Sequence, residues 1–257
     1  MGQSLRLQIR SLGLDDLVGV IHENYERVRE TINLSALRCG RNPAHVKLVV
    51  VSKAQTITVI EAAVKAGIRV FGENYPEEAI EKTQYFRAIK DIEWHMIGHL
   101  QSRKARLIID SFCYLHSLDS MHLAEKLNSL LSTNQKSLPV LLEMNVSGEE
   151  SKFGWPAWEE DRWIDLVPVF NELINYHQIK ISGLMTMPPF FEDSEKARPY
   201  FIKLRKLSDF LALKIPDMKW RELSMGTSID FAVAVEEGAT FVRVGQAILG
   251  SRPAKSV

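Results

Sequence analysis

The stretch Lys47-Leu48-Val49-Val50-Val51-Ser52-Lys53-Ala54-Gln55-Thr56 decides the fold. It reads as a short β-branched strand and a turn, and a helical pattern begins directly afterwards at Ile57. A doubly wound open sheet usually carries a Gly-x-Gly-x-x-Gly turn after its first strand. The turn here, from Ser52 to Thr56, holds no glycine. The sequence therefore favours a closed parallel barrel over an open sheet.

A strand-like run followed by a helical pattern recurs along the whole chain. Eight such runs are expected, at Val46–Ser52, Ile68–Phe71, Ile92–Ile97, Phe112–His116, Leu138–Asn145, Ile179–Leu184, Lys219–Leu223 and Thr240–Val244. Helical patterns lie between them, at Ile57–Lys65, Pro76–Ile89, Gln101–Ile109, Met121–Leu131, Trp158–Tyr176, Glu195–Leu213 and Ser228–Glu236. Parallel strands need a crossing helix for each return, and eight such units close on themselves. We therefore predict an α/β fold, a single (β/α)8 TIM-type barrel.

An extra helix is expected before the first strand. Apolar residues recur at helical spacing from Leu17 to Ile32, and Asp15 or Asp16 would cap this helix. No Pro- or Gly-rich linker divides the chain. We predict one domain over residues 1–257, with an extra segment at 1–15 and the N-terminal helix at 16–38.

The composition is that of a soluble globular protein. Of 257 residues, 46% are hydrophobic and 25% are charged, and Lys plus Arg equals Asp plus Glu at 32 each. This balance creates no global field toward nucleic acid or an acidic membrane surface. Cys39 and Cys113 show no paired or metal-type spacing, and no apolar run reaches the length of a membrane span. We expect a cytoplasmic protein that binds neither nucleic acid nor membrane.

The functional groups of such a barrel belong at the C-terminal ends of its strands. Side chains alternate along a strand, so Lys53 shares a face with Val49 and Val51 and enters the barrel mouth if these two point inward. Poor hydration there would lower the pKa of the lysine and favour the neutral amine that forms a Schiff base. The alternative is a lysine that snorkels to the surface.

Two further segments end the last two predicted strands, where barrels often bind phosphate. Leu223 to Ser228 reads Leu-Ser-Met-Gly-Thr-Ser, and its small residues could free backbone N–H groups at a helix start. Ser228 could equally be a plain N-cap. Arg243 shares a strand face with Phe241 and Gly245, and it needs an acceptor from a ligand or from a partner carboxylate.

Other polar segments are less specific. Phe71 to Tyr75 follows the second strand with polar residues that could orient a ligand or simply start a helix at Pro76. His95 and His99 are spaced i, i+4 but lack the glutamate of a zincin, so no metal is expected. No Gly-x-Ser-x-Gly elbow supports serine hydrolysis.

Taken together, these segments resemble the pyridoxal phosphate homeostasis proteins, the YggS/PROSC family, which are related to the barrel of alanine racemase. The matching stretches occur in family order between residues 46 and 253. They are Val50–Lys53, Phe71–Tyr75, Trp94–Ser102, Ile181–Met187, Leu223–Gly226 and Val242–Gly245. The resemblance implies fold type III of the proteins that bind pyridoxal phosphate, a form of vitamin B6.

The resemblance also implies how the cofactor is held. Lys53 would carry pyridoxal 5′-phosphate as an aldimine, a Schiff base on its side-chain amine. Ser224 and Gly226, with the backbone around Gly245, would hold the phosphate.

The remaining predicted contacts concern the ring. Asn74 and Ile97 would line it, and Arg243 would face the pyridine nitrogen. An arginine there disfavours protonation of that nitrogen and weakens the electron sink that carbanion chemistry needs. We therefore expect a non-catalytic carrier or buffer in pyridoxal phosphate homeostasis, with no catalytic residue.

The sequence departs from the family near the predicted site. Gln246 stands where the family usually has threonine, Thr227 replaces a common methionine, and Arg103 replaces a common asparagine. After Lys53 the frequent second lysine is absent. Lys152 resembles a loop lysine that could act as a secondary acceptor, or it could be a solvated loop residue.

Two alternative functions stay open at this point. One is an amino-acid racemase with a one-domain site, in which a barrel tyrosine such as Tyr75 replaces the base that alanine racemase takes from its second domain. The other is noncovalent binding of a different phosphorylated metabolite. Apo-enzymes that depend on pyridoxal phosphate are candidate partners, and the missing racemase dimer domain favours a monomer.

Overall fold

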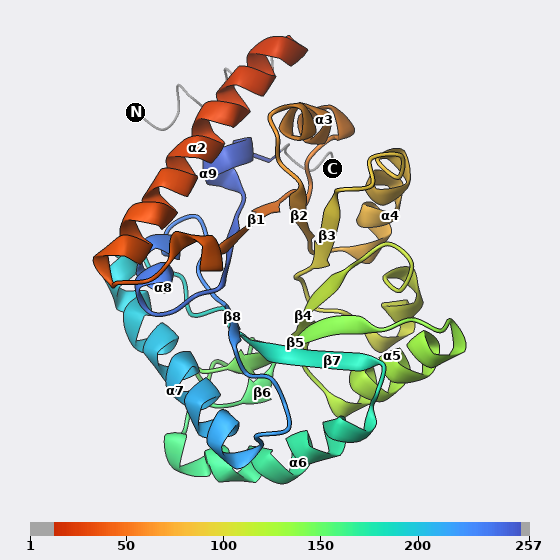
Figure 1. Ribbon diagram of the computed structural model, residues 1–257, viewed down its shortest axis with the longest axis vertical. Coiled ribbons are helices and arrows are strands. Elements are labelled where there is room, and N and C mark those ends of the chain that lie inside the picture. Colours follow the sequence, from red (N-terminus) through yellow and green to blue (C-terminus); the bar gives the residue numbers. More distant parts are fainter. Residues whose placement is uncertain (1–12, 253–257) are drawn as a thin grey trace.

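The computed structural model describes residues 13–252 of the chain and forms a closed parallel barrel (Figure 1). Its strands are β1 (Lys47–Val51), β2 (Val70–Glu73), β3 (Glu93–Met96), β4 (Tyr114–Leu118), β5 (Leu138–Asn145), β7 (Ile179–Met185), β8 (Glu222–Ser224) and β9 (Phe241–Val244). They pair in the order β4-β3-β2-β1-β9-β8-β7-β5, and a β4–β5 pairing closes the ring. A short β6 (Trp155–Pro156) adds to the end of β5. The predicted eight-stranded barrel is confirmed.

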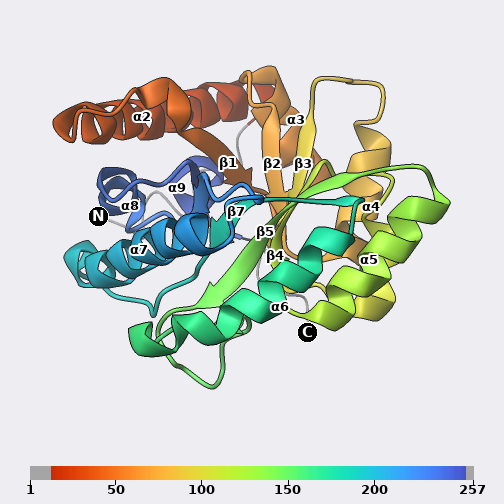
Figure 2. The same cartoon turned by 60° about the horizontal axis from the view of Figure 1, so that its bottom comes forward.

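Helices surround the strands on the outside, as Figures 1 and 2 show. They are α3 (Ile57–Lys65), α4 (Pro76–Tyr85), η2 (Ser102–Leu107), α5 (Met121–Thr133), α6 (Leu166–Glu172), α7 (Arg198–Lys214), α8 (Phe231–Glu236) and α9 (Gln246–Leu249). Short 3-10 turns complete the set at Pro43–His45 (η1), Glu160–Asp165 (η3), Leu173–Asn175 (η4) and Ser194–Ala197 (η5). The helix predicted at Trp158–Tyr176 is therefore split into η3, α6 and η4.

The extra N-terminal helix is α2 (Leu14–Arg38), which packs across α3, α8 and α9 (Figure 1). It starts slightly before the predicted position, and its N-cap is Gly13 rather than an aspartate. Asp15 and Asp16 instead lie in the first turn, where a carboxylate favours the positive end of the helix dipole. Of the predicted extra segment, residues 1–12 lie outside the described residues.

Alternation along the strands fills the barrel and leaves its C-terminal end polar. Val49, Leu141, Met185 and Phe241 are buried together as an apolar layer inside the ring. The next inward position on each of these strands is two residues further on and lies nearer the mouth. On β9 that position is Arg243, and this change from apolar to polar residues is where a ligand site can form. No helix within residues 13–252 is long and apolar enough to span a bilayer.

Candidate functional site

A cavity of about 260 Å³ opens at the C-terminal end of the barrel. It is lined by Val51, Lys53, Asn74, Ile97, Met187, Phe190, Thr227, Ser228, Ile229, Arg243, Gly245, Gln246 and Arg252. Five of the predicted site residues are in this wall, namely Lys53, Asn74, Ile97, Arg243 and Gly245. They lie at or just after the C-terminal ends of β1, β2, β3 and β9, which are neighbours in the barrel. The fold therefore gathers groups that lie far apart in the sequence.

Lys53 enters this cavity from the turn that follows β1, and its side chain is half-buried. Burial lowers the pKa of its amine, and the positive charge of Arg252 lowers it further. Both effects favour the neutral amine, which is the nucleophilic form. A side chain that lines the cavity agrees with a lysine at the barrel mouth better than with one that snorkels into bulk solvent.

A buried ion-pair network fixes the turn that carries Lys53. Lys82 of α4 donates from Nζ to the Ser52 carbonyl at 2.8 Å and to Glu73 Oε1 at 2.7 Å, and it also pairs with Glu78. The Ser52 hydroxyl donates to Glu73 Oε1 at 2.7 Å. Glu78 Oε1 accepts the Ala54 N–H at 2.7 Å. Ala54 has a left-handed φ of 57°. Sequence reasoning missed this network.

Ser224 and Gly226 lie outside the cavity wall. The Ser224 side chain is fully buried inside the barrel, where its hydroxyl contacts His116 Nδ1 at 2.8 Å and accepts a hydrogen bond from Arg243. Gly226 has a φ of 91°, and an added Cβ would lie 2.6 Å from Ala234 Cβ. A glycine is therefore needed at position 226 for the turn after β8. The buried position of Ser224 does not support a contact between its hydroxyl and a phosphate.

The cavity wall at this position is formed instead by Thr227 and Ser228. The interpretation of Ser228 as an N-cap was wrong, because α8 begins at Phe231 and its N-cap is Asp230. Ser228 Oγ instead accepts the Gly245 N–H at 3.3 Å. The loops after β8 and β9 thus meet at a hydroxyl and a backbone amide on the cavity wall.

Arg243 is buried, and no carboxylate in the described part of the chain forms a hydrogen bond with it. Its guanidinium donates to Ser224 Oγ and, at 2.9 Å, to the Thr186 carbonyl, which are both uncharged acceptors. Burial lowers its pKa to about 10, although the charges of Asp230 and Glu143 oppose this shift. A structural ion pair therefore does not explain this arginine. Its charge remains available to a ligand in the cavity.

Asn74 and Ile97 form the side of the cavity on β2 and β3. Asn74 Oδ1 is buried and has no hydrogen-bond partner within residues 13–252, which is costly unless a ligand or water donates to it. An added Cβ at Gly98 would lie 2.5 Å from the Asn74 carbonyl oxygen, so a glycine is needed for this close approach. Glu73, the residue before Asn74, faces the opposite way into the ion-pair network.

Lys152 and Tyr75 do not line the cavity. Lys152 Nζ donates to the carbonyls of Met187 at 2.8 Å and Pro188 at 2.7 Å, and it lies 3.3 Å from Glu149. Its amine is therefore engaged in holding two loops together. Tyr75 is more than half exposed, so it is not positioned as a base inside the site.

Glu143 carries the clearest pH dependence of the barrel interior. Among the described residues its buried Oε2 has no hydrogen-bond partner, and burial raises its pKa to about 7, helped by the charge of Asp119. The pKa of this carboxyl is higher in the folded protein than its unfolded value of 4.5. The folded protein therefore becomes less stable as the pH rises from 4.5 to about 7 and the buried carboxyl ionises. We expect Glu143→Gln to be more stable than the parent at pH 8 by up to about 3 kcal/mol, and to lose this advantage near pH 4.5.

Urea unfolding of both proteins at the two pH values checks this prediction. Glu150 is exposed and provides the control: Glu150→Gln should change the free energy of unfolding only slightly, and by the same amount at both pH values. A stability difference for Glu143→Gln that does not change with pH would contradict the expected burial of its charge.

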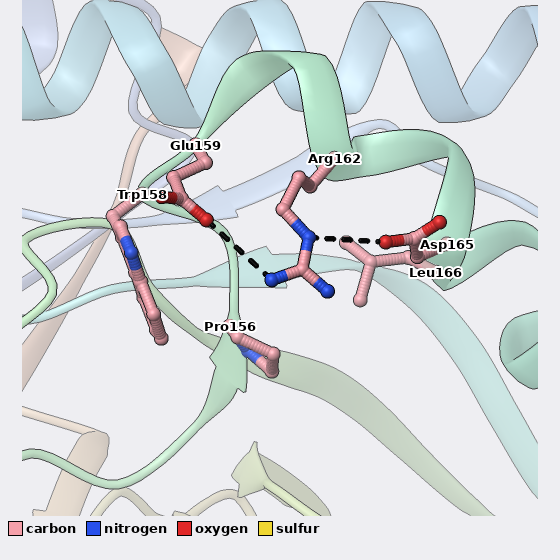
Figure 3. Close-up of a pocket in the computed structure, with 6 residues that line it drawn as sticks. All are labelled: Pro156, Trp158, Glu159, Arg162, Asp165 and Leu166. Carbon is pink, nitrogen blue, oxygen red and sulfur yellow. Dashed lines mark hydrogen bonds and ion pairs between the residues drawn. The ribbon is translucent and has the colours of Figure 1, made fainter.

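A second cavity, of about 250 Å³, lies beside η3 and α6 and is shown in Figure 3. Arg162 lies between Glu159 and Asp165 there, at 3.7 and 3.2 Å. These three side chains are largely exposed and neutralise one another. Exposed pairs of this kind contribute little, and the cavity offers no buried unpaired group.

His95 and His99 do not share a site. His95 is fully buried inside the barrel, whereas His99 is exposed beyond the end of β3. The donor atoms of Glu93, His95 and Cys113 do lie within 4.8 Å of one another near the N-terminal end of the barrel. Lys47 Nζ already lies 2.9 Å from the Glu93 carboxylate, so a cation is present there without a metal.

Comparison with known proteins relates this site to one family. The family described as "Alanine racemase, N-terminal domain" matches residues 21–253. The chain is 39% identical over 230 residues to the "Pyridoxal phosphate homeostasis protein" of Aquifex aeolicus, covering 90% of this chain and 97% of that one. It is 36% identical over 234 residues to the protein of the same name from Escherichia coli K12, with coverages of 90% and 97%.

Solved structures agree with the sequence comparison. The structure of PipY from Synechococcus elongatus PCC7942 with PLP bound matches with a TM-score of 0.75 and 33% identity, covering 90% of this chain and 100% of that one. An alanine racemase from Clostridium difficile 630 matches at 17% identity with a TM-score of 0.66, over 93% of this chain and 58% of that one, which supports the fold alone. The chain therefore belongs to the alanine racemase N-terminal domain family and, within it, to the pyridoxal phosphate homeostasis proteins.

Proposed function

We propose that this protein binds pyridoxal 5′-phosphate covalently through Lys53 and serves as a carrier or buffer in the homeostasis of that cofactor. The observation that carries the proposal is the half-buried Lys53 amine, whose pKa is lowered, inside a cavity that also holds two arginines. When bound, the cofactor supplies an aldehyde carbon that can pass from one amine to another. The lysine keeps that carbon from stray amines until an acceptor arrives.

The phosphate is assigned to the loops after β8 and β9. We assign Ser228 in place of Ser224 and Gly226 and keep the Gly245 backbone in this role, because Ser228 and Gly245 line the cavity whereas Ser224 and Gly226 do not. Their mutual hydrogen bond of 3.3 Å is long, so an anion can compete for the Gly245 amide. Thr227 and Arg252 lie in the same wall and add a hydroxyl and a positive charge. Gln246 offers an amide where the family usually has a hydroxyl.

The ring is assigned to the space between β3 and β9. Arg243 faces the pyridine nitrogen in this arrangement, and Ile97 contributes an apolar wall. Asn74 gains a partner for its buried Oδ1 from a donor on the ligand or an ordered water. A guanidinium beside the pyridine nitrogen keeps that nitrogen unprotonated and favours storage over carbanion chemistry.

The racemase alternative is not favoured. A two-base racemization needs an acid or base opposite the lysine, and Tyr75 lies outside the cavity wall. Lys152, the proposed secondary acceptor, is bound to two carbonyls and would have to leave them first. An assay of amino-acid α-proton exchange on purified protein separates the two functions. Exchange at ordinary enzymatic rates would overturn the proposal that the protein is a carrier.

We also infer a cytoplasmic, monomeric protein whose partners are apo-enzymes that require the cofactor. The near-neutral composition and free cysteines support the compartment. Light scattering during size-exclusion chromatography tests the monomer. A purified apo-enzyme is given the loaded protein either in the same chamber or across a dialysis membrane. Recovery of its activity in both arrangements indicates release of the cofactor into solution, whereas recovery only in the shared chamber indicates direct transfer.

The central test is chemical trapping. Purified protein loaded with pyridoxal phosphate is treated with borohydride, digested, and searched by mass spectrometry for a phosphopyridoxyl lysine. We expect the label on the peptide that contains Lys53. A label distributed over exposed lysines, or found on Lys152 alone, would defeat the assignment.

A further inference from the structure

A continuous line of polar side chains crosses the inside of the barrel from its N-terminal end to the cavity. His95 Nε2 lies 3.3 Å from Glu93 Oε2, and His95 Nδ1 lies 2.9 Å from His116 Nε2. His116 Nδ1 lies 2.8 Å from Ser224 Oγ, which in turn contacts the guanidinium of Arg243. Both histidines and Ser224 are fully buried. The line uses none of the groups assigned to the phosphate.

The Arg243 end of this line fixes the direction of its hydrogen bonds. A guanidinium has donors only, so Ser224 Oγ accepts from Arg243. The hydroxyl proton of Ser224 then needs an acceptor in a buried site, and His116 Nδ1 is the acceptor within reach. His116 therefore carries its own proton on Nε2 and donates it to His95 Nδ1.

The opposite end requires the same direction. Glu93 is ionised, because its hydrogen bond with His95 and the nearby Lys47 ammonium lower its pKa to about 2. A carboxylate only accepts, so His95 carries its proton on Nε2 and donates it to Glu93. Burial lowers the pKa of both histidines, which keeps each of them a neutral ring with one donor and one acceptor. A donor-only group at one end and an acceptor-only group at the other thus allow one arrangement of protons.

We infer that Glu93, His95 and His116 are positioning residues, which hold the Ser224 hydroxyl so that its lone pair faces Arg243. With that acceptor and the Thr186 carbonyl in place, the guanidinium is oriented without a carboxylate beside it. The inference rests on the proposed function only for the identity of the ligand group that Arg243 contacts. Under that proposal, a carboxylate at the far end of the barrel helps to aim the arginine at the pyridine nitrogen.

The proton arrangement can be measured without cofactor. In protein labelled with ¹⁵N-histidine, long-range ¹H–¹⁵N correlation spectra distinguish the two neutral tautomers, and His95→Asn and His116→Asn variants assign the signals. We expect both rings as Nε2–H tautomers. An Nδ1–H tautomer, or a charged ring at neutral pH, for either residue would overturn the inference.

Two substitutions at Glu93 distinguish the role of its carboxylate as a hydrogen-bond acceptor from a general effect on the fold. Glu93→Gln keeps an oxygen that accepts from His95 and should preserve both tautomers, whereas Glu93→Leu removes it and should release His95 into a mixture. Glu61→Leu, another partly exposed glutamate that pairs with a lysine, is the matched control and should leave the histidine spectrum unchanged. Unchanged tautomers in Glu93→Leu would contradict a role for the carboxylate.

The consequence for the cavity is tested on the loaded protein. Glu93→Leu should retain pyridoxal phosphate about tenfold more weakly, equivalent to one lost hydrogen bond, and Glu93→Gln should restore retention. Equal retention in all variants would show that the line does not position Arg243. If Lys53 were not the attachment site, the tautomers of the unloaded protein would still decide the inference, so the two failures are distinguishable.

Discussion

Lys53→Ala is expected to lose all covalently held pyridoxal phosphate. The parent should show an absorbance band near the visible edge that survives gel filtration and becomes irreversible on borohydride treatment. The variant should lack this band, because the cavity wall offers no other lysine among the described residues. The spectrum before and after reduction measures the effect. A band that persists in Lys53→Ala would show that another amine forms the linkage.

Two comparisons sharpen this result. Lys152→Ala removes an amine that is bound to loop carbonyls, and it should keep the band. In the Lys53→Ala background the phosphate site should still bind the cofactor weakly and noncovalently. Adding Ser228→Ala there should weaken that binding by about tenfold, as for the loss of one charge-assisted hydrogen bond, whereas adding Thr58→Ala, at an exposed position of α3, should not. Equal binding in both double variants would remove Ser228 from the phosphate site.

The barrel could be predicted from the sequence because its periodicity is local. Each strand-like run and the helix after it are set by alternation and spacing within a few residues, and Ile57–Lys65 was predicted with the bounds of α3. The cavity residues at strand ends followed from the rule that parallel strands end on one face. Lys53, Arg243 and Gly245 were found in this way, and all three line the cavity.

The choice between the serine that ends β8, Ser224, and the serine in the loop after it, Ser228, could not be made in this way. Ser224 is the last residue of the strand and points into the barrel, and the left-handed turn at Gly226 then redirects the chain so that Ser228 reaches the cavity. Which serine faces a ligand depends on the dihedral angles of that turn, and periodicity does not encode them. The resemblance to a family implied Ser224, whereas the cavity wall contains Ser228.

The histidine line and the ion-pair network were missed for a different reason. Each depends on contacts between residues that are distant in sequence, such as His116 with Ser224 and Lys82 with Ser52. One local signal did exist. Lys82 falls on the buried stripe of α4 with Pro76 and Ala79, where a lysine is unusual and requires a buried partner. The identity of that partner, however, required the fold.

Lys82→Met is expected to destabilise the protein by about 3–5 kcal/mol, because it leaves Glu73 as a buried charge without its partner. The side chains of Lys82 and Glu73 are 4% and 0% exposed, so solvent cannot replace the lost ion pair. Burial already raises the pKa of Glu73 against the opposing charge of Lys82. Without that charge its folded pKa rises further above its unfolded value, so the destabilisation should be larger at pH 8 than at pH 5.

Urea unfolding at both pH values measures this effect, with Lys65→Met as the matched control. Lys65 forms a partly exposed i,i+4 pair with Glu61 within α3, so its removal should cost less than about 1 kcal/mol at either pH. The double variant Lys82→Met with Glu73→Gln should recover part of the loss, since no buried charge is then left unpaired. It should nevertheless hold pyridoxal phosphate less firmly than the parent, because the Ser52 carbonyl has lost its donor and the turn that aims Lys53 is no longer fixed. A double variant as unstable as Lys82→Met alone would show that packing of the lysine, rather than its charge, holds the turn in place.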